Sequence, residues 1–325
     1  MSIPNPAARH AACIAFGALA AACTPLALAA QDSTSQAASA QSEIVVTARA
    51  AGAPMWTIPT ATGTVILVGE IRRVPEATPW YPDRLTEATS EADRVILGAR
   101  PKFSPGDFFR LIFRGGRFLK LPDKSVAGDY LSPAQRARLA ALEAQYDKDY
   151  DRGSFLITAF DLLARRLDFD DDTLDDDATD VVKSAAEKAD IAILRPERFR
   201  GEDLLDDLAE AEPASHIPCL EAAMAATEAG PAIIEARGRA WTGLDVKSVM
   251  ANPLEIALGR CWPWADPEVG SEIRDQWTGM IETAAADRGT TLGVVPLRLL
   301  AEAGGVLDQL EAGGFTIYGP DWRSE

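Results

Sequence analysis

The run Thr64-Val65-Ile66-Leu67-Val68, which stops at Gly69, decides the fold class of this chain. Successive β-branched and apolar residues between turn signals are typical of a buried strand. Arg94-Val95-Ile96-Leu97 has the same character, and so does Thr291-Leu292-Gly293-Val294-Val295 close to the C-terminus. Both ends of the chain are therefore expected to supply strands to the core.

Helical patterns occupy most of the sequence between these strands. Ser132, Pro133 and Gln135 form a helix start: the serine caps, the proline suits the first turn, and the glutamine completes a capping box. We expect further helices at residues 156–167, 175–189, 201–210, 219–229, 267–288 and 304–311, and short strands at 191–194 and 315–318. The alternation predicts an α/β fold, with a mixed or parallel sheet of strand–helix–strand units at both ends of the chain and a helix-rich middle.

The N-terminus has the parts of a secretory signal peptide. Arg9 gives a basic start, an apolar run follows, and Ala27-Leu28-Ala29 offers the small residues that signal peptidase requires. We therefore expect a signal peptide at residues 1–30, a flexible leader at 31–54 and a single domain at 55–322, in a periplasmic or secreted protein. The alternative is a lipoprotein anchored at Cys23, because Ala20-Ala21-Ala22-Cys23 loosely resembles a lipobox.

Composition excludes several function classes. The formal net charge of −17 disfavours nucleic acid as a partner, since an acidic surface repels phosphate backbones. The chain has two histidines, and His10 lies in the signal peptide, which leaves His216 alone. One imidazole cannot build the familiar metal sites that need two or three, so we expect no metal and no other cofactor. The hydrophobic fraction of 47% suits a globular core.

Two cysteines, Cys219 and Cys261, remain once the signal peptide is set aside. In an exported chain such a pair predicts one disulfide bond, and separate buried thiols are the alternative. The segment from Arg100 to Lys124 is basic and aromatic within an acidic chain. It could contact an anionic membrane surface, or its apolar faces could cover the sheet while the basic groups reach water. Residues 168–180 hold eight aspartates but lack the glycine and glutamate of a calcium loop, which favours a solvated, helix-capping loop.

The ends of the first and last strands carry recognisable stretches. The first reads Gly69-Glu70-Ile71-Arg72-Arg73-Val74-Pro75 and is followed, after a helix, by Ala92-Asp93-Arg94-Val95-Ile96-Leu97. The last reads Leu292-Gly293-Val294-Val295-Pro296-Leu297 and leads to Gly314-Phe315-Thr316-Ile317. These stretches resemble the TraB/GumN (TraB/PrgY/GumN, Tiki-like) family, which reads Gly-Thr-Ile-His, Ser-Asp-x-Leu-Val-Leu-Glu and Gly-Ala-x-His at the corresponding places. The resemblance runs from about Trp56 to Tyr318 and implies the family's fold.

Members related to the Tiki proteins are regarded as metal-dependent proteases, so the resemblance implies a site in which two motif histidines and carboxylates hold a metal ion. In this sequence Arg72 and Pro296 stand at the two histidine positions, and neither side chain can ligate a metal. Gln276-Trp277 replaces the family's Arg-Asn pair. We interpret the chain as a degenerate member, whose altered or retained motif positions are Gly69, Glu70, Arg72, Gly98, Gly293 and Pro296.

Two classes of function remain open at this stage. The first is a pseudoenzyme, a non-catalytic binding or envelope-associated protein with a small ligand or an unknown envelope partner. The second is a hydrolase or protease-like enzyme whose site is rebuilt from carboxylates such as Glu70 with Arg72. Convergent acids with a raised pKa at the strand ends would favour the enzyme, and a basic or apolar plug there would favour the binding protein.

Overall fold

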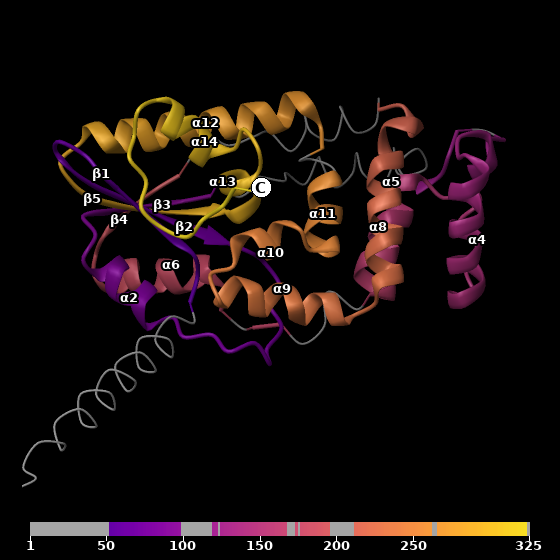
Figure 1. Ribbon diagram of the computed structural model, residues 1–325, viewed down its shortest axis with the longest axis horizontal. Coiled ribbons are helices and arrows are strands. Elements are labelled where there is room, and N and C mark those ends of the chain that lie inside the picture. Colours follow the sequence, from indigo (N-terminus) through magenta and orange to yellow (C-terminus); the bar gives the residue numbers. More distant parts are fainter. Residues whose placement is uncertain are drawn as a thin grey trace, which may run out of the picture. The chain divides into compact units, whose positions relative to one another are not determined.

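A five-stranded sheet organises the part of the chain that the computed structural model describes, which is residues 52–98, 119–122, 124–167, 173–174, 176–195, 211–261 and 265–323 (Figure 1). The strand order is β1-β2-β5-β3-β4. β1 runs antiparallel to β2, and the other pairs are parallel, so the sheet is mixed. The strands span Met55–Pro59 (β1), Gly63–Glu70 (β2), Arg94–Leu97 (β3), Ala192–Leu194 (β4) and Gly289–Pro296 (β5).

Helices cover both faces of the sheet (Figure 1). α12 and α13 contact β2 and β5 on one face, and α14 packs on both helices. On the other face α6 contacts β2, β3 and β5, and α2 packs on α6. These helices span Asp83–Ser90 (α2), Ala178–Lys188 (α6), Pro267–Ala286 (α12), Leu297–Ala301 (α13) and Val306–Ala312 (α14).

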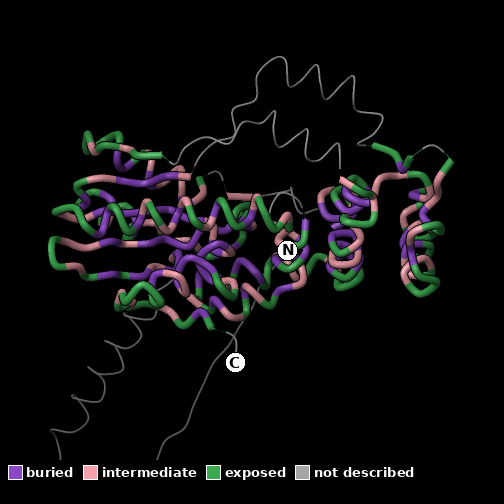
Figure 2. Tube along the Cα trace, turned by 90° about the horizontal axis from the view of Figure 1, so that it is seen from above, coloured by how far each residue is buried: buried purple, intermediate pink, exposed green. Residues whose placement is uncertain are grey.

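The three central strands, β2, β5 and β3, are mostly buried because both faces of the sheet are covered there, which is why they read as continuous apolar runs. Trp56, Ile58, Leu67 and Ile96 lie in this core and have almost no exposed surface. Figure 2 shows the same distribution, with buried residues along the strands and exposed residues on the outer sides of the helices. No helix within the described ranges is both long and apolar enough to cross a bilayer.

A second hydrophobic cluster lies in the helix-rich middle of the chain and includes Phe155, Leu162, Leu220 and Met224. Its helices span Pro133–Tyr146 (α4), Phe155–Asp161 (α5), Leu162–Arg166 (a π-helix), Ile217–Ala229 (α8) and Pro253–Arg260 (α11). The chain returns from α8 to the sheet through Ala232–Thr242 (α9) and Val246–Met250 (α10). Short 3-10 turns at Ala127–Asp129 and Pro213–His216 precede α4 and α8.

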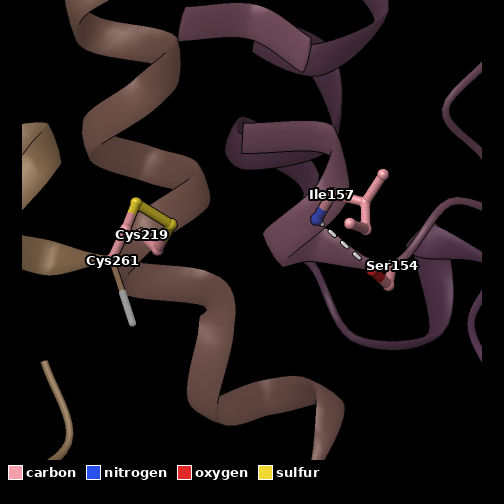
Figure 3. Close-up of a disulfide and its surroundings, with 4 residues drawn as sticks. All are labelled: Ser154, Ile157, Cys219 and Cys261. Atoms are coloured by element: carbon pink, nitrogen blue, oxygen red, sulfur yellow. Dashed lines mark hydrogen bonds between the residues drawn. A yellow bond between two sulfur atoms is a disulfide. The ribbon is translucent and has the colours of Figure 1, made fainter. Parts of the chain in front are cut away.

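The predicted disulfide is present between Cys219 in the first turn of α8 and Cys261 at the end of α11, with the Cα atoms 4.6 Å apart (Figure 3). Both sulfur-bearing side chains are buried in the second cluster. Figure 3 also shows Ser154, whose hydroxyl caps α5 by accepting a hydrogen bond from the backbone N–H of Ile157 at 3.3 Å. The bridge therefore fixes the N-terminal end of one helix to the C-terminal end of another.

Most element predictions agree with the structure, and one does not. The capping box at Ser132 is formed, with Gln135 bonded to Ser132 in both directions. Residues 315–318 were expected to form a strand, but they make only a single bridge between Thr57 and Tyr318 at the edge of β1. Gly319 packs against the ring of Trp56, and the indole N–H of Trp56 binds the carbonyl oxygen of Pro320, so the chain turns across the edge instead of following it.

Candidate functional site

The carboxyl ends of β2 and β5 meet at one edge of the sheet. The two strands pair in parallel register from Gly63 opposite Gly289 to Glu70 opposite Pro296. In parallel sheets, ligands bind outside the carboxyl ends of the strands, because the loops that follow them diverge there. The motif positions that are far apart in the sequence are therefore neighbours in the fold.

Glu70 is the last residue of β2 and is buried, with 5% of its surface exposed. Its Oε1 accepts a hydrogen bond from the backbone N–H of Thr179 in α6 at 2.9 Å, and its Oε2 lies 3.9 Å from Nε of Arg72. Burial raises the pKa of Glu70, and the negative charge of Asp177 raises it further, against the opposing effects of Thr179 and Arg72. This carboxyl group joins the end of β2 to the first turn of α6.

Asp177 is the N-cap of α6, and its Oδ1 accepts a hydrogen bond from the backbone N–H of Asp180 at 3.0 Å. The start of α6 is also fixed to the loop after β2. The backbone N–H of Leu174 donates to the carbonyl oxygen of Val74 at 2.8 Å, and Thr173 forms a bridge with Pro75. Two segments that are about a hundred residues apart in the chain thus form one wall of the site.

A buried arginine on α9 binds the main chain of the loop after β2. Nη1 of Arg237, on α9, donates to the carbonyl oxygen of Arg72 at 2.9 Å. The side chain of Arg72 itself is 76% exposed. The main chain at position 72 is therefore anchored by Arg237, while the Arg72 guanidinium extends into solvent beside Glu70.

Arg237 is itself held by Glu255 on α11. Its Nε and Nη2 both lie 2.6 Å from Oε2 of Glu255. Arg298, two residues beyond Pro296, lies 3.4 Å from the other carboxylate oxygen and also donates to the carbonyl oxygen of Glu255. Burial alone would raise the pKa of Glu255, but Arg237 and Arg298 outweigh burial, and the pKa is lowered. This buried network connects the loop after β2 with α13, the helix that follows β5 directly.

Two stacked tryptophans border the same edge. Trp241 on α9 donates its indole N–H to the carbonyl oxygen of Gly69 at 2.8 Å. Its ring stacks on Trp80 with centroids 4.7 Å apart. A Cβ at Gly69 would lie 2.6 Å from the side chain of Leu297 and 3.0 Å from the ring of Trp56, so either neighbour would have to shift. The glycine thus allows β2, α13 and Trp56 to approach closely.

These elements enclose a cavity of about 260 Å³. It opens beside the strand ends, with charged groups of both signs and aromatic surface on its walls. The residues that define it are Arg72, Arg73, Trp80, Asp177, Asp180 and Trp241. The cavity is the feature of this edge that can accept another molecule.

A comparison with known sequences decides the family. The sequence profile of the TraB/PrgY/gumN family matches residues 54–318, which is most of the chain and includes every residue of this site. The chain belongs to the TraB/PrgY/gumN family. No curated protein and no solved structure matches it.

The family motif positions can now be placed. Gly69 and Glu70 end β2, and Gly293 lies within β5 against Leu67 and Ile96. Gly98 follows β3, where a Cβ would meet the ring of Trp277 on α12 at 3.8 Å. Trp277 is buried, so the end of β3 lies beside an apolar indole.

A divalent metal does not fit this TraB-family site. Within the described residues no group of three or more histidine, cysteine, aspartate or glutamate side chains is placed to hold an ion. At the motif positions the side chains are a guanidinium at Arg72 and a pyrrolidine at Pro296, neither of which donates to a metal. Glu70 is buried and already bound to Thr179. The carboxyl group of Glu70 therefore joins β2 to α6 and is not presented to a metal ion.

Several residues of the site were not predicted from the sequence, among them Arg237, Trp241 and Glu255. These three lie on α9 and α11, in a region for which no helix was predicted. Capping signals were present, because Asp245 caps α10 and Asn252 caps α11 before Pro253. Those signals locate the helices, but they do not reveal that a buried arginine on one of them reaches the loop after β2.

Other sequence features fall partly or wholly outside the described residues. These are the signal peptide with Cys23, the leader up to residue 51, most of the segment from Arg100 to Lys124, half of the acidic stretch and the helix predicted at residues 201–210. The last residues of the leader are described and belong to the fold: Gly52 bonds to Thr242, and Pro54 bonds to Gly69. His216 ends the 3-10 turn before α8, and burial lowers its pKa.

Proposed function

We propose that this TraB-family protein is exported from the cytoplasm and acts outside it as a non-catalytic binding protein. Its ligand is held at the ends of β2 and β5. The proposal treats the chain as a pseudoenzyme: the fold of the family is kept, and the strand-end site serves recognition. The export part rests on the signal-peptide pattern at residues 1–30.

One observation carries the proposal: the side chains at the strand ends are used to hold the loops in place. Glu70 binds α6, and Arg237, Glu255 and Arg298 form a buried network beneath the loops. The apolar ring of Trp277 lies beside Gly98. In a site built in this way these side chains serve to present a fixed cavity to a ligand. A preorganised cavity is what tight binding requires.

A peptide-cleavage assay tests the proposal. Purified mature protein is incubated with a denatured protein substrate in the presence of zinc, manganese or cobalt, and fragments are followed by mass spectrometry. We expect no cleavage above the level of a metal-only blank. Metal-dependent cleavage that is abolished by a chelator and restored by the metal would contradict the proposal.

A hydrolase remains the second candidate, because one observation favours it. Glu70 has a raised pKa and a second carboxylate, Asp177, close enough to affect it. Carboxyl pairs with shifted pKa values occur in general acid–base sites. If the protein cleaves the substrate without added metal, the cleavage rates of the variants Glu70→Gln and Asp177→Asn show whether these two carboxyl groups are catalytic. An enzyme of this kind loses at least about a hundredfold in rate on loss of its general acid or base.

A further inference from the structure

The charges around the strand-end cavity are of both signs and come from two neighbouring segments. Arg72 and Arg73 come from the loop after β2, and Asp177 and Asp180 come from the start of α6. Both segments lie close to Glu70, which is 3.9 Å from Arg72 and is also affected by the charge of Asp177. A ligand with a single charge would therefore have a like charge near it in this cavity.

The third side of the cavity is apolar. Trp80, half-buried and stacked on Trp241, provides an aromatic surface, and Leu174 and Val74 continue it. Aromatic faces attract ammonium groups as well as apolar bodies. The cavity of about 260 Å³ lies below the range of about 300–1,000 Å³ that drug-sized ligands occupy. Its ligand is therefore small.

The walls are fixed before any ligand arrives. Leu174 is bonded to Val74, Arg237 holds the carbonyl oxygen of Arg72, and Asp177 caps α6. Preorganisation of this kind reduces the entropy cost of binding. It also keeps the segments that carry the two charges bonded to each other, which favours a ligand whose own charges are close together.

We infer that the strand-end cavity binds a free α-amino acid with an apolar side chain. The ligand carboxylate pairs with the guanidinium of Arg72, the ammonium group pairs with Asp177, and the side chain lies against Trp80. This inference rests on the proposed binding function and gives that function a ligand class: a compact zwitterion.

Isothermal titration calorimetry with L-phenylalanine and two truncated probes tests the inference on the mature protein. 3-Phenylpropanoate lacks the ammonium group, and 2-phenylethylamine lacks the carboxylate. We expect L-phenylalanine to bind with a Kd below about 1 mM, and each truncated probe to bind at least about tenfold more weakly, because one charge-assisted pair is lost.

Variants locate the site. Arg72→Gln removes the cation, and Asp177→Asn removes the anion while leaving a good helix cap, so each should weaken L-phenylalanine at least about tenfold. Arg165→Gln is the matched control, since Arg165 is also 76% exposed and also lies beside an acid, Asp161, at 3.5 Å. Binding by this control should equal that of the wild type.

The outcomes separate the ligand class from the proposed function. If 3-phenylpropanoate binds as tightly as L-phenylalanine and depends on Arg72, the zwitterion inference is wrong and the binding function stands. If L-phenylalanine does not bind, or binds unchanged to both variants, the inference is also wrong. The cleavage assay then judges the proposed function independently, because it does not depend on any of these probes.

Discussion

Glu70 and Glu255 are both buried carboxylates, yet their neighbours differ in sign. Glu70 faces Asp177 and has a raised pKa, whereas Glu255 lies between Arg237 and Arg298 and has a lowered pKa. Opposite shifts predict opposite dependences of stability on pH, because each group releases its proton at a different pH in the folded and unfolded chain. The pair therefore provides an internal comparison within one protein.

Glu70→Gln is expected to stabilise the protein at neutral pH by about 1 kcal/mol. A raised pKa means that the folded protein holds the proton at a pH where the unfolded chain has lost it, so wild-type stability falls as pH rises from about 4.5 through the folded-state pKa. A glutamine keeps an acceptor for Thr179 without the charge. Denaturant unfolding between pH 4 and pH 8 should show the advantage growing with pH, and a variant that is less stable at pH 8 than the wild type would contradict this.

Glu255→Gln is expected to destabilise the protein by about 3 kcal/mol at neutral pH, since it leaves two arginines without their buried counter-charge. The lowered pKa means that this contribution is present above pH 4.5 and is lost as pH falls through the folded-state pKa. The same unfolding series should thus show the cost shrinking on acidification. A cost that stays constant down to pH 3 would mean that the ion pairs are not its source.

At the scale of the element, β2, β3 and β5 were readable from the sequence, because a strand covered on both faces is apolar along most of its length. Arg94–Leu97 was predicted with the observed bounds, and Thr64–Val68 lies within β2. The strand predicted at residues 315–318 does not form. Its alternating apolar residues gave no sign that Gly319 and Pro320 would pack against Trp56 of β1. The parallel register places Glu70 opposite Pro296 at the carboxyl ends of β2 and β5.

The anchoring of the site was not readable in the same way. It depends on α9 and α11, which approach the sheet through packing between elements far apart in the sequence. Arg237 and Arg72 are separated by 165 residues, and nothing near either residue specifies the other. Polar contacts of this range follow from the assembled fold.

The disulfide between α8 and α11 gives a prediction at the element scale. It closes a loop of 42 residues, so replacing both Cys219 and Cys261 with alanine should lower the free energy of unfolding by roughly 3–4 kcal/mol in the chain-entropy model. The oxidised wild type should release no thiol on denaturation without reductant. Two titratable thiols per mature chain under those conditions would show that the bond does not form.

At the scale of the whole molecule, the destination of the protein is a separate prediction. The mature protein recovered from outside the cytoplasm should lack its first 29 or 30 residues, because Ala27-Leu28-Ala29 sets the cleavage site. Intact-mass spectrometry of the recovered protein measures this loss of mass directly. A diacylglyceryl-modified N-terminus at Cys23 would instead establish the lipoprotein, and an unprocessed chain in the cytoplasm would contradict export.

The central claim is that a TraB-family scaffold here carries a strand-end site that binds a ligand and holds no catalytic metal. Elemental analysis of natively purified protein, dialysed without chelator, tests it most directly, with the double variant Arg72→His and Pro296→His as a comparison that restores both motif imidazoles. We predict well below one zinc, manganese or cobalt per wild-type chain, and a higher zinc content in the double variant. About one tightly held transition-metal ion per wild-type chain would contradict the claim.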